Sequence, residues 1–383
     1  DLLVRGHIAY NRGGTLDDDK VEVGAEQFYL ERRFGFDGVE LGAELTWKFG
    51  AQGELLFGWD GKQHDHKIET FSRIDRISGM ASEINPPQNK TLDNIGVFAQ
   101  YSVDISRAWR MIAGIRSDDD SVIGQHTSSR LGFVGQVFED TVVKLLYGSS
   151  FQAPSPELLY RTAVQAGDII GNPNLDAQTA DTYEISFSRP FGSYVYASLT
   201  YFYTEVDKLV VFNSDGSNLF AQNSASHETE GVETELRLIW KDVNAFFNFS
   251  WQESRRGSSE FSLYKLERRP TGELFPKGMA NIGLSYYWQK PEINLSFTTR
   301  WVDKRPASSS NVLLANQVYH LDPYWLSNFT VSSERWSLVE GYTTHLRMHI
   351  RDLFDHNPVT PGFGGVEFPG AGRQLMFSIE QEF

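Results

Sequence analysis

Hydrophobic and polar residues alternate along most of this chain with a repeat of two. In the segment 39–49 the odd positions carry Val, Leu, Ala, Leu, Trp and Phe, whereas the even positions carry Glu, Gly, Glu, Thr and Lys. The segments 228–240 and 342–351 repeat the pattern, with Leu236 and Met348 each standing between charged or polar residues. Successive side chains of a β-strand point to opposite faces, so the alternation predicts strands with one apolar and one polar face.

The length of these segments separates a membrane barrel from a soluble sandwich. They run to about 10 to 13 residues, which suits a tilted strand that crosses a bilayer, whereas strands of soluble proteins average about five or six. The pattern predicts about 17 strands, near residues 1–10, 20–31, 38–49, 51–59, 91–104, 107–117, 127–137, 140–150, 178–189, 193–205, 226–240, 242–253, 277–288, 291–303, 320–333, 341–351 and 371–383. The predicted fold class is therefore all-β, an antiparallel transmembrane β-barrel with about 17–18 strands visible in this chain.

Short and long connections alternate between the predicted strands. Tight connections are expected at Phe138–Asp140, Trp240–Asp242 and Trp288–Pro291, among others, and long ones at roughly 59–91, 151–177, 206–226, 254–276, 304–319 and 354–370. Bacterial barrels place short turns in the periplasm and long loops outside the cell. With a periplasmic C-terminus, every long connection is extracellular and the strand at 1–10 runs inward. An odd strand count of this kind predicts that residues 1–383 form one barrel domain that is incomplete at its N-terminus and has no plug domain.

Composition narrows the possible functions. The net charge of −15, without any basic block, argues against a nucleic-acid partner. Aromatic residues make up 14% of the chain and gather near strand ends, as at Trp47 and Trp288, where an interfacial girdle would lie. Cysteine is absent, which fits exposure to an oxidising periplasm. The chain starts at Asp1 without a signal peptide, which we interpret as a processed or truncated product.

The sequence contains no catalytic or metal-binding constellation that rises above chance. It lacks the Gly-x-Ser-x-Gly, His-Glu-x-x-His and phosphate-loop motifs, so we expect neither an enzyme nor a cofactor. Histidines and acidic residues cluster at three places: His64 and His66 with Asp60 and Asp65 in the 59–91 loop, Asp17–Asp19, and Asp118–Asp120. None of these clusters has the spacing of a defined zinc or calcium site. We therefore predict no bound metal.

Several segments resemble the C-terminal barrel of TonB-dependent receptors. "YGSSFQAPSPELLY" (Tyr147–Tyr160) and "GNPNLDAQTADTYEIS" (Gly171–Ser186) are similar to the family's strand, loop and strand around a Gly-Asn-Pro-x-Leu motif. The other matching segments are "GVFAQYSVDISRAWRMIAGIRSDDD" (Gly96–Asp120), "NSASHETEGVETEL" (Asn223–Leu236), "RDLFDHNPV" (Arg351–Val359, with Asp352 where the family usually has Asn) and "PGAGRQLMFSIEQEF" (Pro369–Phe383). The order of the motifs over about 290 residues carries the resemblance more than any one of them.

The resemblance implies a receptor of the Gram-negative outer membrane that takes up a scarce ligand, with a ferric siderophore as the leading class and vitamin B12 or a glycan as the others. A full family barrel has 22 strands around a plugged lumen, and neither the plug nor the energy-coupling box is matched here. The implied partners are outer-membrane lipids, a plug domain or another chain that completes the barrel, and a TonB-type energy-coupling system. Two alternatives stay open: a passive porin-like channel, and a receptor-derived barrel that anchors a larger complex. A soluble β enzyme is the least favoured.

The family binds its ligand at the outer loops, which implies candidate ligand contacts in this chain: Tyr160, Arg161, Gln165, Asn172, Asn174, Arg255 and Arg256, with Phe212, Phe220, Tyr319 and Phe363 as further loop candidates. The Gly-Asn-Pro motif is expected to shape a turn, because Gly and Asn tolerate left-handed geometry and Pro fixes φ. The terminal Phe383 is the expected closing residue of the barrel and its assembly signal.

A row of cations is expected on the lumen side of the wall. His345, Arg347, His349 and Arg351 alternate with apolar residues and so share one face, as do Glu233, Glu235 and Arg237. The cations could contact a plug or attract an anionic ligand. The simpler interpretation, which we favour, is a wet wall whose charges are balanced by Glu233, Glu235, Glu40 and Glu44.

Overall fold

The computed structural model describes residues 1–16, 20–22, 27–50, 53–85, 88–138, 140–163, 168–214, 218–257, 275–306, 319–360 and 367–382. The chain divides into two compact units. Unit 1 comprises Asp1–Val134, Leu146–Thr182 and Glu205–Ser226, and unit 2 comprises Gly135–Leu145, Tyr183–Thr204 and His227–Phe383.

Long antiparallel strands form nearly all of the regular structure. Within the described ranges, 20 strands join in one sheet and four short ones form two separate pairs. The long strands are β1 (Leu2–Gly14), β3 (Phe28–Phe49), β4 (Gly53–Asp75), β6 (Gln88–Asp104), β7 (Trp109–Asp120), β8 (Gly124–Phe138), β9 (Thr141–Gln152), β11 (Gln178–Phe191), β12 (Val195–Ser214), β13 (Leu219–Trp240), β14 (Val243–Gly257), β15 (Gly278–Trp288), β16 (Ile293–Val302), β19 (Tyr324–Ser333), β21 (Tyr342–Arg351) and β24 (Gln374–Gln381). The short strands are β2 (Lys20–Glu22), β5 (Ala81–Glu83), β10 (Ile169–Ile170), β17 (Arg305–Pro306), β18 (His320–Leu321), β20 (Trp336–Val339), β22 (Val359–Thr360) and β23 (Phe368–Pro369), and one helix, α1 (Pro156–Tyr160), lies between β9 and β10.

Residues with a left-handed backbone close several of the tight connections. Asp140, Lys241 and Glu292 have φ angles of 66°, 52° and 64° and lie between β8 and β9, β13 and β14, and β15 and β16. Such residues reverse the chain within a few positions. The tight connections predicted at these three places are confirmed.

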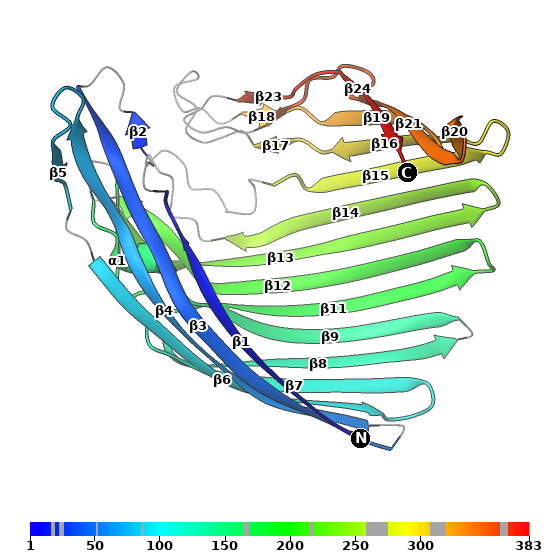
Figure 1. Cartoon of the computed structure of the whole chain (residues 1–383). Coiled ribbons are helices and arrows are strands. Elements are labelled where there is room, and N and C mark those ends of the chain that lie inside the picture. Colours follow the sequence, from blue (N-terminus) through cyan, green and yellow to red (C-terminus); the bar gives the residue numbers. More distant parts are fainter. Residues whose placement is uncertain are drawn as a thin grey trace. The chain divides into compact units, whose positions relative to one another are not determined.

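The strands of unit 1 have a continuous register that creates two different faces. β1 pairs with β3, β3 with β4, β4 with β6 and β6 with β7, and Figure 1 shows these strands side by side. One face carries apolar residues that line up across neighbouring strands, such as Ile8 of β1, Leu41 of β3 and Ile95 of β6. The opposite face carries charged residues, such as Asp60 and Arg116. The alternation in the sequence therefore forms an apolar face and a polar face, as predicted.

Predicted strand boundaries are wrong at three places. The segments 20–31 and 38–49 were expected as two strands, but β3 is one strand from Phe28 to Phe49. β4 reaches Asp75, so His64 and His66 lie on a strand and not in a long 59–91 loop. Likewise, β12 and β13 occupy most of the expected 206–226 loop. Beyond the apolar band the strict alternation ends while the cross-strand pairing continues: in β3 the apolar residues Phe34 and Phe36 lie on the other face, and in β4 residues 62–67 are all polar.

The expected direction of the first strand is also wrong. The strand count had placed residues 1–10 and 38–49 in the same direction, whereas β1 and β3 pair antiparallel from Leu2 opposite Trp47 to Gly14 opposite Gly35. The cause is the extra strand counted between them. The argument for a missing N-terminal part from an odd count therefore fails, and the single-domain assignment of residues 1–383 stays a prediction.

Candidate functional site

A group of interacting polar side chains in unit 1 lies at a β-bulge of β4. The pairing of β3 with β4 shifts by one residue between Arg33 and Gly35, so Ile68 and Glu69 together face a single residue of β3. Both residues are buried, with 2% and 9% of their surfaces exposed. A bulge leaves one backbone group without its ladder partner, and here the N–H of Glu69 donates to Oε1 of Glu157 at 3.2 Å.

Glu157 lies in α1, and the sequence determines where this helix begins. Ser155 is the N-cap, and its side chain accepts a hydrogen bond from the N–H of Leu158 at 3.3 Å. Pro156 occupies the first turn, where its missing N–H costs nothing. The helix therefore presents the Glu157 carboxylate to the bulge of β4.

Two arginines neutralise the buried carboxylate of Glu69. Arg161 Nη2 lies 3.2 Å from one oxygen and Arg32 Nη1 lies 3.6 Å from the other, and the Glu69 side chain is only 11% exposed. Burial raises the pKa of the Glu157 carboxyl above its usual range; the neighbouring charge of Glu69 adds to the rise, while the Glu69 N–H and Arg161 oppose it. The site thus joins β3, β4 and α1 through two carboxylates and two guanidinium groups.

The side chain of Asn85 ties a third segment to this site. Its Nδ2 donates to the carbonyl oxygen of Glu69 at 3.0 Å and to Oγ1 of Thr162 at 3.1 Å, and its Oδ1 accepts from the N–H of Phe71 at 2.7 Å. Asn85 is 6% exposed, so these bonds replace its hydration. Sequence reasoning missed both Asn85 and Glu69, because their partners are distant in the chain.

The Gly-Asn-Pro motif forms a turn, in which the N–H of Leu175 donates to the carbonyl oxygen of Asn172 at 3.3 Å, and it also holds α1 in place. Neither Gly171 nor Asn172 has the left-handed backbone that was expected there. The N–H of Gly171 donates to the carbonyl oxygen of Arg161 at 2.7 Å, and the N–H of Asn172 donates to that of Leu158 at 2.8 Å. A Cβ at Gly171 would lie 2.6 Å from the backbone nitrogens of Tyr160 and Arg161, so only glycine fits. We call α1 with Arg161, Glu69, Asn85, Gly171 and Asn172 the α1 platform.

A small apolar cluster supports the platform. Leu159, Leu175 and Ala221 are buried together, and the predicted loop candidate Phe212 packs against them. Asn172 Nδ2 donates to the carbonyl oxygen of Ala221 at 2.9 Å. The helix α1 and the Gly-Asn-Pro segment are therefore packed against the strands of unit 1 and do not form an isolated loop.

The predicted ligand contacts fall into three groups. Tyr160 and Arg161 lie on the platform, where the ammonium of Lys90 stands 4.7 Å from the centre of the Tyr160 ring. Both atoms of the Asn172 side-chain amide are engaged, Nδ2 with the carbonyl oxygen of Ala221 in β13 and Oδ1 with the N–H of Asn174, whereas the Asn174 side chain is exposed. Gln165, the side chains of Arg255 and Arg256, Phe363 and Phe383 lie outside the described residues. Contact of any of these residues with a ligand stays a prediction.

An ionic bridge on the polar face of unit 1 holds β4 to β7. Arg116 binds both oxygens of Asp60 at 2.6 and 2.8 Å and both oxygens of Asp118 at 2.6 and 2.8 Å. The bridge passes over Gly96, where a Cβ would lie 2.0 Å from Arg116 Nη2. Asp118, which belongs to one of the acidic runs noted in the sequence, is therefore buried and paired.

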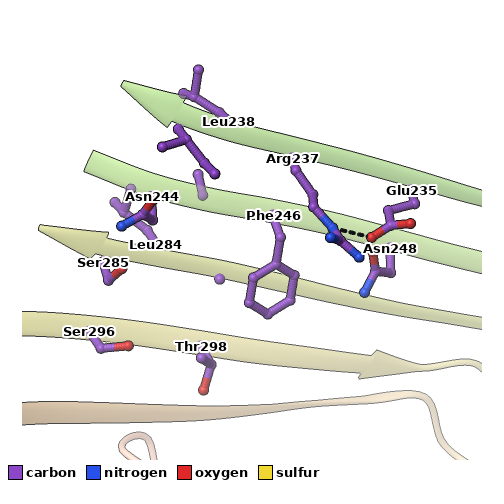
Figure 2. A pocket seen from close by; sticks show the side chains of 13 residues that line it. Glu235, Arg237, Leu238, Asn244, Phe246, Asn248, Leu284, Ser285, Ser296 and Thr298 are labelled. Carbon is purple, nitrogen blue, oxygen red and sulfur yellow. Dashed lines mark hydrogen bonds and ion pairs between the residues drawn. The ribbon is translucent and has the colours of Figure 1, made fainter. Parts of the chain in front are cut away.

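In unit 2 the charged residues predicted for the lumen do share faces. Glu235 and Arg237 form an ion pair on β13. They line a cavity of about 390 Å³ together with Phe246 and Asn248 of β14 and Thr298 of β16. Figure 2 shows Arg237 and Phe246 on adjacent strands, turned toward the same side. Phe246 covers Gly283, whose Cβ would lie 2.1 Å from the ring.

The cationic row lies along β21, and its neighbours differ from those expected. His345 and Arg347 stand opposite Glu380 and Ser378 of β24, and His349 and Arg351 opposite Met376 and Gln374. His345 Nε2 lies 3.7 Å from a carboxylate oxygen of Glu382. The carboxylates expected to balance the row are mostly paired elsewhere: Glu235 with Arg237, Glu40 with His64 and Glu44 with Arg5. The balance of charge between these carboxylates and the row stays a prediction, and Glu380 and Glu382 next to β21 are acidic neighbours that it did not include.

A second polar group of unit 2 was missed by sequence reasoning. Arg305 is 6% exposed, donates from Nη2 to the carbonyl oxygen of Val359 at 2.6 Å, and lies 5.3 Å from the centre of the Tyr324 ring. Tyr319, a predicted loop candidate, donates to Glu367. Burial raises the pKa of Glu367, against the opposing charge of Arg305.

Within the described ranges, no three His, Asp or Glu side chains come close enough together to hold a metal ion. No helix in the part of the chain that the structure describes is long and apolar enough to cross a membrane.

The model of a known protein family matches this arrangement over nearly the whole chain. The family is described as "TonB dependent receptor-like, beta-barrel", and the match covers residues 4–348. The chain belongs to this family. Its members are receptors and transporters of the outer membrane, so the predicted fold class and family resemblance are confirmed.

Three known proteins illustrate the similarity. The iron-regulated outer membrane virulence protein of Vibrio cholerae serotype O1 is 22% identical over 99% of this chain and 57% of its own length. The vitamin B12 transporter BtuB of Vibrio cholerae serotype O1 is 30% identical over 79% of this chain and 45% of its own length. The structure of a mutant ferric enterobactin receptor, PfeA of Pseudomonas aeruginosa, superposes with a TM-score of 0.69 at 14% identity, over 98% of this chain and 59% of that one. The chain thus spans about half the length of the curated relatives that it matches.

Proposed function

We propose that this chain is the barrel wall of a TonB-dependent transporter that takes up a ferric siderophore. The match of the family model to residues 4–348 carries the transporter part of the proposal. The relatives support the ligand class, since one is named as iron-regulated and one solved neighbour is named as a ferric enterobactin receptor. A plug domain and a TonB-type partner belong to the proposal, as do a periplasmic C-terminus and extracellular long loops.

The α1 platform is the proposed ligand-facing surface of unit 1. Arg32, Lys90 and Arg161 outnumber the carboxylates Glu69 and Glu157, and the Tyr160 ring lies beside Lys90. Cations suit an anionic iron chelate better than a neutral corrinoid or a sugar, and the aromatic ring adds an apolar contact surface. The fixed position of α1 would lower the ordering cost of ligand binding.

Growth on single nutrients tests the ligand class. Cells that lack the gene encoding this chain should fail to grow when ferric siderophores are the only iron source, and the intact gene should restore growth. Growth that depends on the gene only when vitamin B12 or a glycan is limiting would replace the siderophore with that ligand. Iron uptake that is unchanged in the deleted strain, on every siderophore tested, would contradict the proposal.

A further inference from the structure

A hollow on the apolar face of unit 1 lies just beyond the end of the apolar band. Gly14 of β1 stands opposite Gly35 of β3, so two adjacent strands lack side chains at this level. A Cβ at Gly14 would lie 3.1 Å from the Cα of Gly35, which shows how closely the two backbones approach. A cavity of about 510 Å³ is found here, and Arg12, Arg33 and Lys67 are among the residues that line it.

These three cations belong to the apolar face and not to the polar face. On β1, Arg12 follows Ile8 and Tyr10 at alternate positions, and on β3, Arg33 precedes Val39 and Leu41 in the same alternation. Lys67 stands opposite Gly35, on the same face as Trp59. Alternate residues of a strand share a face, so the cations continue the surface that contacts lipid in a family barrel.

The distance along the strands places this hollow at the membrane boundary. The apolar positions of β3 run from Val39 to Phe49, which spans about 33 Å along the strand at ~3.3 Å per residue and roughly 25 Å of membrane depth at the usual tilt. This matches the height of the apolar band of such barrels. Asp37 and Arg12 are opposite each other at the next level up, so the hollow lies at the depth of the lipid headgroups.

The charge of the hollow opposes that of the whole chain. Among the described residues that line the cavity, three are cations and one, Asp37, is a carboxylate, although the chain carries a net charge of −15. Glu31 pairs with Arg33 at 2.9 Å, but the Arg33 side chain is still 68% exposed. Neither Arg12 nor Lys67 makes an ion pair with the residues that the structure describes. Arginine and lysine around a concave polar surface suit phosphate groups.

We propose that this hollow, which we call the glycine hollow, binds the phosphorylated headgroup of a lipid of the outer leaflet. The long connections face outward in barrels of this kind, and the hollow lies at that end of β1, β3 and β4. Arg12, Arg33 and Lys67 contact the phosphate groups, and the two glycines leave room for the headgroup. The lipid fixes the height of β1 and β3 in the membrane. The inference rests on membership of an outer-membrane family and is independent of which ligand is transported.

Native mass spectrometry of the purified full chain in detergent micelles tests this site, with diphosphoryl lipid A and its dephosphorylated form as probes. The unmodified chain should retain the diphosphoryl lipid and release the dephosphorylated one. The triple variant Arg12→Gln, Arg33→Gln, Lys67→Gln should bind diphosphoryl lipid A at least about tenfold more weakly, because each basic residue near a charged lipid surface contributes appreciably to binding.

A matched control removes the same charge elsewhere. Arg107, Lys290 and Arg335 are exposed in turns, and the triple variant Arg107→Gln, Lys290→Gln, Arg335→Gln should bind as the unmodified chain does. The charge-preserving variant Arg12→Lys, Arg33→Lys, Lys67→Arg should retain binding. If the first triple variant does not fold, the single variant Lys67→Gln tests the proposal instead, and it should bind diphosphoryl lipid A about fivefold more weakly than the unmodified chain. Equal binding of both lipids, or an equal loss in the control, would overturn the proposal.

Discussion

Replacement of Gly171 by alanine should detach the α1 platform without unfolding the strands. The added Cβ would lie 2.6 Å from the backbone nitrogens of Tyr160 and Arg161 and 2.7 Å from the carbonyl carbon of Leu159. These are backbone atoms, which cannot turn aside as the end of a side chain can. The chain at residue 171 must therefore move away from α1.

The size of the effect follows from the contacts that are lost. Two hydrogen bonds, from Gly171 to Arg161 and from Asn172 to Leu158, contribute about 1 kcal/mol each. Exposure of Leu159, which is 1% exposed in the structure, costs a further ~2 kcal/mol. The free energy of local opening should fall by about 2 to 4 kcal/mol, so amide hydrogen exchange in α1 should accelerate by roughly 30- to 1000-fold.

Hydrogen exchange read by mass spectrometry gives this measurement for peptides that contain α1. Gly148→Ala is the matched control, because a Cβ at Gly148 meets nothing within 4 Å. The control should exchange as the unmodified chain does, and peptides of β3 and β4 should remain protected in both variants. Unchanged protection of α1 in Gly171→Ala would refute the role assigned to the Gly-Asn-Pro motif.

Three further predictions concern the polar sites of unit 1. The raised pKa of Glu157 means that α1 docking is strongest near and below the ordinary carboxyl pKa of 4.5 and weakens as pH rises through the raised value. Glu157→Gln should remove this pH dependence, measured by amide hydrogen exchange corrected for the intrinsic exchange rate. Gly96→Ala should displace Arg116 from its carboxylates and lower the unfolding free energy, measured in urea, by about 1 to 3 kcal/mol. The control Gly61→Ala, whose added Cβ would have its nearest atom at 3.8 Å, should change the unfolding free energy little. Equal urea midpoints for the two variants would contradict a stabilising role of the Arg116 bridge. Asn85→Ala should lose three hydrogen bonds and make the segment 76–85 sensitive to protease. Unchanged cleavage would argue against the tie of Asn85 to the platform.

Alternation predicted the strands well wherever a strand crosses the apolar band. The segments 91–104 and 277–288 agree with β6 and β15 within a few residues. The same rule failed at β3 before residue 38 and at β4 beyond residue 59, because apolar and polar residues no longer alternate there in the same phase, although the hydrogen-bonded ladder continues. The strand count and the direction of the first strand failed with it.

The candidate site was only half predictable for a different reason. The Gly-Asn-Pro motif and Arg161 could be recognised from local sequence. The bulge at Glu69 and the hydrogen bonds of Asn85 depend on pairing between segments that lie far apart in the chain, as between Glu69 and Glu157. The glycine hollow likewise requires the register of β1 against β3, which places Gly14 and Gly35 opposite each other. Such coincidences follow from the fold and leave no local signal.

Energy-dependent uptake tests the central claim most directly. Cells that carry the intact gene and cells that lack it are given a radiolabelled ferric siderophore, with and without a protonophore that collapses the inner-membrane proton gradient. The account predicts that only cells with the gene accumulate iron, and that the protonophore stops accumulation while surface binding persists. Accumulation that requires the gene but continues unchanged after the protonophore would show a passive channel and contradict the claim.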